Sequence, residues 1–246
     1  MRRFFVAPEF LRQNTGVIAG DLSRHISTVL RLKSGDHLRL ADGAGHEAEA
    51  IITSIAKDGI HVEIGPSQQM SKAVDSTRIT MYQGLPKGEK TDLILQKCTE
   101  LGVARVVIFM AARSVTKLEG DRLPKRLSRW ERIVQEAARQ SGREDIPSVV
   151  FAESLGEALG SNASSLGFLI WEGEEDQGLK AVIARSDKPE SVSIVIGPEG
   201  GLTSEEAAEA VDFGFIPVSL GKRILRTETA GLSVVSILQY VWGDLG

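Results

Sequence analysis

The sequence of 246 residues predicts an α/β fold, in which a small β-rich domain precedes a larger domain built on a parallel sheet. After Arg78, short apolar runs with strand propensity alternate with amphipathic segments, which is the pattern of a parallel sheet connected by helices. Before residue 70, turn dipeptides separate short β-prone runs. Residues 66–75 are polar, lack a clear period and are typical of a linker. We therefore expect domains at residues 1–70 and 74–246.

The N-terminal domain should be a small β-barrel. Asp42-Gly43 and Asp58-Gly59 are turn dipeptides, and the neighbouring runs 49–52 and 60–64 favour strands. Strands at this spacing, separated by tight turns, are typical of a barrel.

The second domain should alternate strands and helices. The expected strands are residues 79–82, 104–110, 166–171, 192–196 and 215–220. The expected helices are residues 91–101, 124–140, 203–213 and 229–242. Thr203 and Glu206 have the spacing of a capping box, and Gly214 follows the end of that helix. Either Thr227 or Thr229 should be the N-cap of the last helix.

Composition indicates a cytoplasmic protein. The single cysteine, Cys98, permits no intramolecular disulfide and should be a core residue. No apolar run has the length of a membrane span, and Pro8 and Glu9 interrupt the N-terminal segment where a signal peptide would need an apolar core.

Charge is distributed unevenly along the chain. The net charge is −4, which by itself disfavours a nucleic-acid partner. Residues 151–246 carry six basic and fifteen acidic side chains, whereas residues 113–143 carry nine basic and four acidic ones. The basic stretch is as consistent with a surface that faces phosphates as with an ordinary solvated helix face.

Three expected strands in the C-terminal third each lead into a loop that contains glycine. These loops begin at Gly173, Gly197 and Gly221. Ligands bind at the carboxyl ends of parallel strands, and glycine permits close approach of the backbone. The three loops therefore predict a ligand pocket.

Several ligand classes are disfavoured. The sequence has neither a Gly-x-Gly-x-x-Gly dinucleotide motif nor a P-loop, and it has no Gly-x-Ser-x-Gly elbow. All four histidines lie before residue 62 without the spacing of metal ligands, so no metal is expected.

Two motifs carry a resemblance to a known family. The first is IGPEGG at residues 196–201, and the second is LGKRILRTETA at residues 220–230, where charged and hydroxyl groups stand between a strand and an apolar helix. Together they resemble the RsmE family, bacterial methyltransferases of the SPOUT class that methylate N3 of a uridine in 16S ribosomal RNA of the small subunit. The likeness extends through RRFFV at the N-terminus, LPKG at residues 85–88, QKCTELGV at 96–103 and EAARQSGR at 136–143.

The resemblance implies a PUA-like RNA-binding barrel followed by a SPOUT domain with a trefoil knot. It also implies S-adenosylmethionine as the methyl donor and 16S rRNA as the partner. The residues expected to form the cofactor pocket are Trp171, Glu172, Ile196, Gly197, Gly200, Gly201, Leu220, Gly221, Ile224, Leu225 and Ala230. The basic residues expected to contact RNA phosphates are Arg2, Arg3, Arg31, Lys87, Arg113 and Arg143.

Uridine N3 carries a proton that must leave before the nitrogen becomes a good nucleophile. Glu199 or Glu228 could be the general base, and Arg226 could stabilise the uridine anion. A structural role for each carboxylate is equally consistent with the sequence.

The last helix is expected to contribute to a homodimer. Apolar residues surround it instead of forming one stripe, so it should be buried on more than one side. Two other functions remain open from the sequence: a SPOUT enzyme that methylates a ribose or another base, and a non-catalytic RNA-binding assembly factor.

Overall fold

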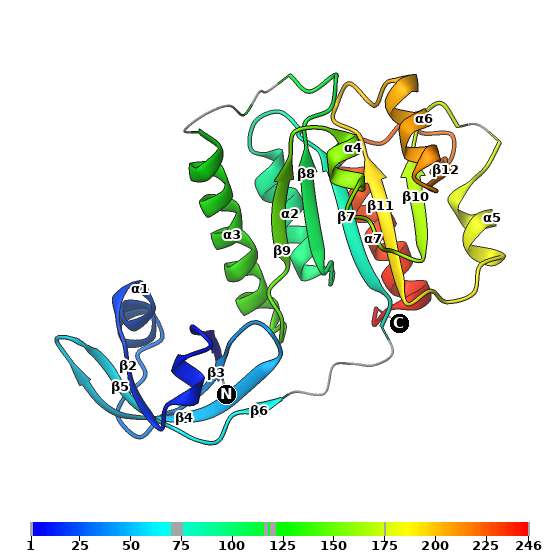
Figure 1. Ribbon diagram of the computed structural model, residues 1–246. Helices are drawn as coiled ribbons and strands as arrows, with labels where there is room; N and C mark the ends of the chain where they lie inside the picture. The colour runs from blue at the N-terminus through cyan, green and yellow to red at the C-terminus, as the bar shows by residue number, and fades with distance from the viewer. Residues whose placement is uncertain (1, 70–75, 116–117, 119–121, 175, 246) are drawn as a thin grey trace. The chain divides into compact units, whose positions relative to one another are not determined.

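The computed structural model describes residues 2–69, 76–115, 118, 122–174 and 176–245 (Figure 1). The chain forms two compact units. The first unit contains residues 1–74 and 138–146, and the second contains residues 75–137 and 147–246.

The first unit is built on a six-stranded sheet. Its strands are β1 (Arg2–Phe5), β2 (Thr15–Ile18), β3 (His37–Ala41), β4 (His46–Ala56), β5 (Gly59–Ile64) and β6 (Gln68–Gln69). The order is β1-β3-β4-β5-β2, and β6 pairs with β4. A short helix α1 (Gly20–Arg24) continues into a π-helical turn over His25–Val29, and a 3₁₀ turn spans Phe10–Arg12. Within the predicted linker, Gln68–Gln69 form strand β6, and residues 70–75 lie outside the described residues.

Alternation along the strands places one apolar face in the core of the first unit. Phe4, Leu38 and Ile52 are buried in one hydrophobic cluster together with Ile26 of the π-helical turn. Gly43 and Gly59, from the two turn dipeptides, have φ of +73° and +147°, which residues with a side chain rarely adopt. Both predicted turns are confirmed.

The second unit is built on a fully parallel sheet, as predicted. Its strands are β7 (Arg78–Gly84), β8 (Arg105–Phe109), β9 (Ser148–Ala152), β10 (Leu166–Ile170), β11 (Ser191–Ile196) and β12 (Ile216–Val218). The order is β12-β10-β11-β7-β8-β9, so β12, β10, β11 and β7 are consecutive neighbours. Their carboxyl ends point to the top of Figure 1.

Helices cover both faces of this sheet (Figure 1). The helices are α2 (Lys90–Glu100), α3 (Arg122–Ser141), α4 (Leu155–Leu159), α5 (Leu179–Ala184), α6 (Ser204–Asp212) and α7 (Thr227–Trp242). Helices α2 and α7 contact each other on the face that carries Met81, and α4 and α6 cover the face that carries Tyr82. Cys98 is buried against Met81, and burial raises the pKa of its thiol to about 12, so the predicted core role of this cysteine is confirmed.

The capping box of α6 is present, with Thr203 and Glu206 bonded reciprocally, and Gly214 follows the helix at φ +85°. The prediction for the start of α7 was wrong. The helix begins at Thr227 and not at Thr229, and its N-cap is Arg226, which makes no side-chain capping bond. The Thr227 hydroxyl donates instead to the carbonyl oxygen of Gly197, a long-range bond that replaces the local cap.

Candidate cofactor pocket and active site

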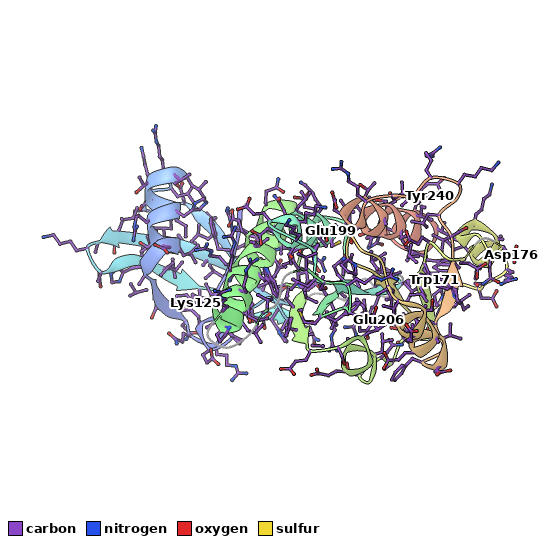
Figure 2. The ribbon with its side chains drawn as sticks, turned by 90° about the horizontal axis from the view of Figure 1, so that it is seen from above. Lys125, Trp171, Asp176, Glu199, Glu206 and Tyr240 are labelled. Carbon is purple, nitrogen blue, oxygen red and sulfur yellow. The ribbon has the colours of Figure 1, made fainter. Side chains whose placement is uncertain are left out.

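A cavity of about 860 Å³ lies at the carboxyl ends of β10, β11 and β12. The three predicted loops follow these neighbouring strands, and residues from all three line the cavity. Figure 2 looks down on this edge of the sheet and labels Trp171 and Glu199, which follow β10 and β11.

The cavity is lined by ten of the eleven predicted pocket residues. These are Trp171, Glu172, Ile196, Gly197, Gly201, Leu220, Gly221, Ile224, Leu225 and Ala230. The exception is Gly200, whose backbone packs against Arg113: an added Cβ would lie 3.0 Å from the Arg113 Cβ. Of the three predicted catalytic residues, Glu199 and Arg226 line the cavity, and Glu228 lies beside it in the first turn of α7.

One wall of the cavity is residues 197–201, here named the glycine loop. A buried polar network fixes its first residue. The Gln83 Nε2 atom donates to the Thr227 hydroxyl at 2.9 Å and to the carbonyl oxygen of Gly197 at 3.3 Å, and the Thr227 hydroxyl donates to the same oxygen at 2.6 Å. Gln83 is 0% exposed. At the other end of the loop, Arg113 Nη1 donates to the carbonyl oxygen of Gly200 at 3.0 Å.

Ion pairs hold the charged residue of the same loop. The Lys90 Nζ atom lies 2.9 Å from Glu199 Oε1 and 3.3 Å from Glu228 Oε2. The backbone N–H of Lys87 also donates to both oxygens of Glu199. Partial burial acts to raise the pKa of Glu199, but these hydrogen bonds and the Lys90 charge outweigh it and hold the pKa below its ordinary value. A carboxylate with a lowered pKa is a weaker base.

A second part of the cavity wall is residues 221–226, here named the basic loop. Gly221 has φ +101°, and a Cβ there would meet no atom within 4 Å. Lys222, Arg223 and Arg226 are exposed, and Ile224 is 84% exposed. Within the described ranges, these three basic side chains form no hydrogen bond or ion pair.

The residues predicted to contact RNA differ in their surroundings. Arg31 is exposed, with φ +54°, and the side chain of Lys87 is exposed. Arg3 pairs with Glu47 at 2.9 Å, and Arg143 pairs with Asp145 at 2.9 Å; both guanidinium groups are largely buried. Arg113 bonds the glycine loop as described above. The side chain of Arg2 lies outside the described part of the structure.

Sequence reasoning missed Lys90, Gln83 and Thr227 as site residues. Lys90 lies just before the expected helix 91–101, Gln83 lies just after the expected strand 79–82, and Thr227 was expected to be a capping residue. Gln83 directly follows the expected buried strand 79–82, and a polar side chain at such a position needs a hydrogen-bond partner, which is the one signal in the sequence that could have pointed to the network.

The structure offers two further observations. Among the residues it describes, no group of three His, Cys, Asp or Glu side chains could hold a metal ion. Within the same ranges, every helix is too short or too polar to span a lipid bilayer.

Comparison with known proteins identifies the family. Residues 74–239 match the family model described as an RNA methyltransferase domain, and residues 18–65 match an RNA methyltransferase PUA domain. The ribosomal RNA small subunit methyltransferase E of Bacillus subtilis is 34% identical over 98% of this chain and 96% of that protein. The relative of the same name from Mycobacterium tuberculosis is 31% identical over 93% of this chain and 90% of its own length.

Solved structures agree with this relationship. The Neisseria gonorrhoeae ribosomal RNA small subunit methyltransferase E bound to S-adenosylmethionine matches with a TM-score of 0.86, 33% identity and full coverage of both chains. A Legionella pneumophila methyltransferase, also in complex with S-adenosylmethionine, matches with a TM-score of 0.85 and 28% identity over 97% of this chain and 96% of that one. The chain belongs to the ribosomal RNA small subunit methyltransferase E family.

Proposed function

We propose that this protein transfers a methyl group from S-adenosylmethionine to N3 of a specific uridine in 16S rRNA. The observation that carries the proposal is the cavity, which residues of both family motifs line at the carboxyl ends of β11 and β12, the two parallel strands on either side of β10. The relative from Neisseria gonorrhoeae, whose structure contains S-adenosylmethionine, matches this chain over its full length.

The cavity fits such a cofactor. Its volume of about 860 Å³ lies within the range of small-molecule sites, roughly 300–1,000 Å³. Backbone groups of Ile196, Gly197, Leu220, Ile224 and Leu225 would hold the adenine and ribose, and Trp171 with Glu172 would close the remaining wall. When bound, S-adenosylmethionine supplies a methyl group on a sulfonium centre.

We assign the main catalytic charge to Arg226. Loss of the N3 proton leaves a uridine anion, and a guanidinium group beside it would favour formation of that anion and so lower the overall barrier from neutral uridine. Arg226 lines the cavity and has no ion-pair partner among the described residues. Glu199 and Glu228 both pair with Lys90, and Glu199 has a lowered pKa, which disfavours it as the base. The N3 proton can then pass to solvent.

RNA binding is proposed to use both units. Residues 1–70 would form a PUA-like barrel within the first unit, and Arg31 with Lys87 would contact phosphates. Arg2, Arg3, Arg113 and Arg143 were expected to do the same. The ion pairs of Arg3 and Arg143 and the loop contact of Arg113 favour structural roles for these three. Residues 74–246 would form the SPOUT domain, with its C-terminal segment in a trefoil knot.

We further propose a homodimer that uses the outer face of α7. Ile237, Tyr240 and Val241 are exposed there, with Tyr240 73% exposed (Figure 2), while Val234, Val235 and Leu238 are buried. Exposed apolar side chains grouped on one face of a helix indicate a contact surface. Light scattering should give twice the chain mass for the parent and the single-chain mass for Tyr240→Asp. A fully active monomer at micromolar concentration would contradict the dimer.

The proposed reaction is tested by methylation in vitro. Purified protein, labelled S-adenosylmethionine and unmethylated small subunits or 16S rRNA are incubated, and the product nucleosides are mapped by mass spectrometry. We expect a single 3-methyluridine. Label in a ribose or in another base would identify a different SPOUT activity, and cofactor binding without label transfer would favour an assembly factor.

A further inference from the structure

The charges of Lys90, Glu199 and Glu228 form a group that joins three separate segments at the cavity. Lys90 is the first residue of α2, Glu199 belongs to the glycine loop after β11 (Figure 2), and Glu228 is in the first turn of α7. The Lys90 Nζ atom is 2.9 Å from one carboxylate and 3.3 Å from the other. One ammonium group therefore bridges two carboxylates that would otherwise repel each other.

Partial burial strengthens the electrostatic interactions among these three groups. The Glu228 side chain is 15% exposed, and its Oε2 atom has no hydrogen bond within the described residues, so the Lys90 ion pair is its main compensation. Lys90 and Glu199 are each about one third exposed, so solvent screens the interaction partly and not fully. The three groups carry a net charge of −1, which would become −2 without the lysine.

We propose that Lys90 is a positioning residue for methyl transfer: it holds Glu199 and Glu228 as a paired group and thereby removes one negative charge from the rim of the site where the uridine anion forms. The inference rests on the proposed function. The proposal predicts that added negative charge at the rim has opposite effects on the substrate and on the cofactor. The substrate anion is repelled by added negative charge at the rim, whereas the sulfonium of the cofactor is attracted by it.

These opposite effects distinguish an electrostatic role of Lys90 from a structural one. If Lys90 only held the glycine loop in place, its removal would weaken cofactor binding and turnover together. If it sets the charge at the rim, its removal lowers turnover while cofactor affinity stays the same or increases. Other charged residues that line the cavity, Glu172, Glu174, Lys222, Arg223 and Arg226, are unchanged in every variant compared.

The experiment compares Lys90→Met with Lys97→Met. Lys97 lies on the same helix, and its Nζ atom pairs with Glu100 at 2.9 Å, but it does not line the cavity. We expect Lys90→Met to lower kcat about tenfold or more. Its dissociation constant for S-adenosylmethionine, measured by calorimetry, should be equal to or below that of the parent. Lys97→Met should match the parent in both.

A second variant keeps the test decisive if Lys90→Met folds poorly. The double variant Lys90→Gln/Glu228→Gln has the same net charge of −1 as the parent, and we expect it to recover most of kcat. Lys90→Arg should do the same. Parallel loss of kcat and cofactor affinity in Lys90→Met, or no recovery in the charge-balanced double variant, would overturn the proposal. A parent protein that makes no 3-methyluridine would instead overturn the proposed function, before any variant is compared.

Discussion

The glycine loop and the basic loop line the same cavity, but they are held in different ways. Hydrogen bonds from Gln83, Thr227 and Arg113 reach the glycine loop, and Lys90 pairs with its Glu199. In the basic loop, residues 221–225 make none of the hydrogen bonds or ion pairs found in the described part of the chain, and Ile224 extends into solvent.

This contrast indicates that the two loops have different functions. Polar groups already satisfied by the protein cost little to bring against a cofactor and keep the pocket in one shape. Exposed, unpaired cations keep their full attraction for a polyanion that arrives from solvent. We therefore expect changes in the glycine loop to affect mainly the cofactor, and changes in the basic loop to affect mainly RNA and turnover.

The largest effect is expected from Gly197→Val. A Cβ at Gly197 would lie 3.1 Å from the backbone C of Gly201 and 3.1 Å from the backbone N of Leu202, so valine must displace the loop. Affinity for S-adenosylmethionine, measured by calorimetry, should fall about a hundredfold or more. The control is Gly178→Val, where a Cβ meets no atom within 4 Å and φ is −81°. Equal affinity in a folded Gly197→Val protein would place the cofactor elsewhere.

Arg226→Met changes the basic loop, and we expect it to affect turnover. Because this exposed arginine has no partner within the described residues, its loss should leave stability and cofactor affinity unchanged. We expect kcat to fall about tenfold to a hundredfold, as for removal of a group that stabilises a developing anion. Arg226→Lys, which keeps the charge, should retain more activity. If cofactor affinity falls as much as kcat, Arg226 belongs to the cofactor wall.

A smaller effect is expected when Lys222 and Arg223 are both changed to Gln. RNA affinity at low salt should fall about fivefold to tenfold, and the slope of log K against log salt should decrease by about 1.4 to 1.8, because two phosphate contacts are lost. The matched control is Lys180→Gln with Arg185→Gln, two exposed cations associated with α5 that do not line the cavity. An equal salt slope in both double variants would argue against an RNA role for the basic loop.

The smallest effect is on stability. In Thr227→Val, Gln83 Nε2 and the carbonyl oxygen of Gly197 each lose a buried partner, which should cost about 1–3 kcal/mol of unfolding free energy. Thr229→Val, two residues later and exposed, should cost almost nothing. Denaturant unfolding measures both, and equal stabilities would mean that the network does not hold the glycine loop.

Much of the fold could be predicted because its causes are local. The capping box at Thr203 and Glu206 and the turns at Gly43 and Gly59 depend on residues within three or four positions of each other. The parallel sheet followed from alternation of strands and helices, and the three loops were found because each follows its strand directly. Their meeting at one cavity required only that the three strands be neighbours.

Local rules failed where a distant partner competed for the same group. Thr227 was expected to be a candidate helix cap, but its hydroxyl bonds Gly197, thirty residues away in sequence. Likewise Glu199 and Glu228 are both reasonable bases in isolation, and Lys90, more than a hundred residues earlier, changes that assessment.

The sequence by itself determined the order of elements, the turns and the family motifs, because backbone propensity and hydrophobic period act over a few residues. Only the tertiary structure decided which polar groups are paired. Hydrogen bonds and ion pairs at long sequence separation depend on which strands become neighbours. The sequence around Glu199 is the same whether or not the distant Lys90 contacts it. For that reason the location of the pocket could be predicted from the sequence, while the division between a hydrogen-bonded wall and an exposed cationic wall could not.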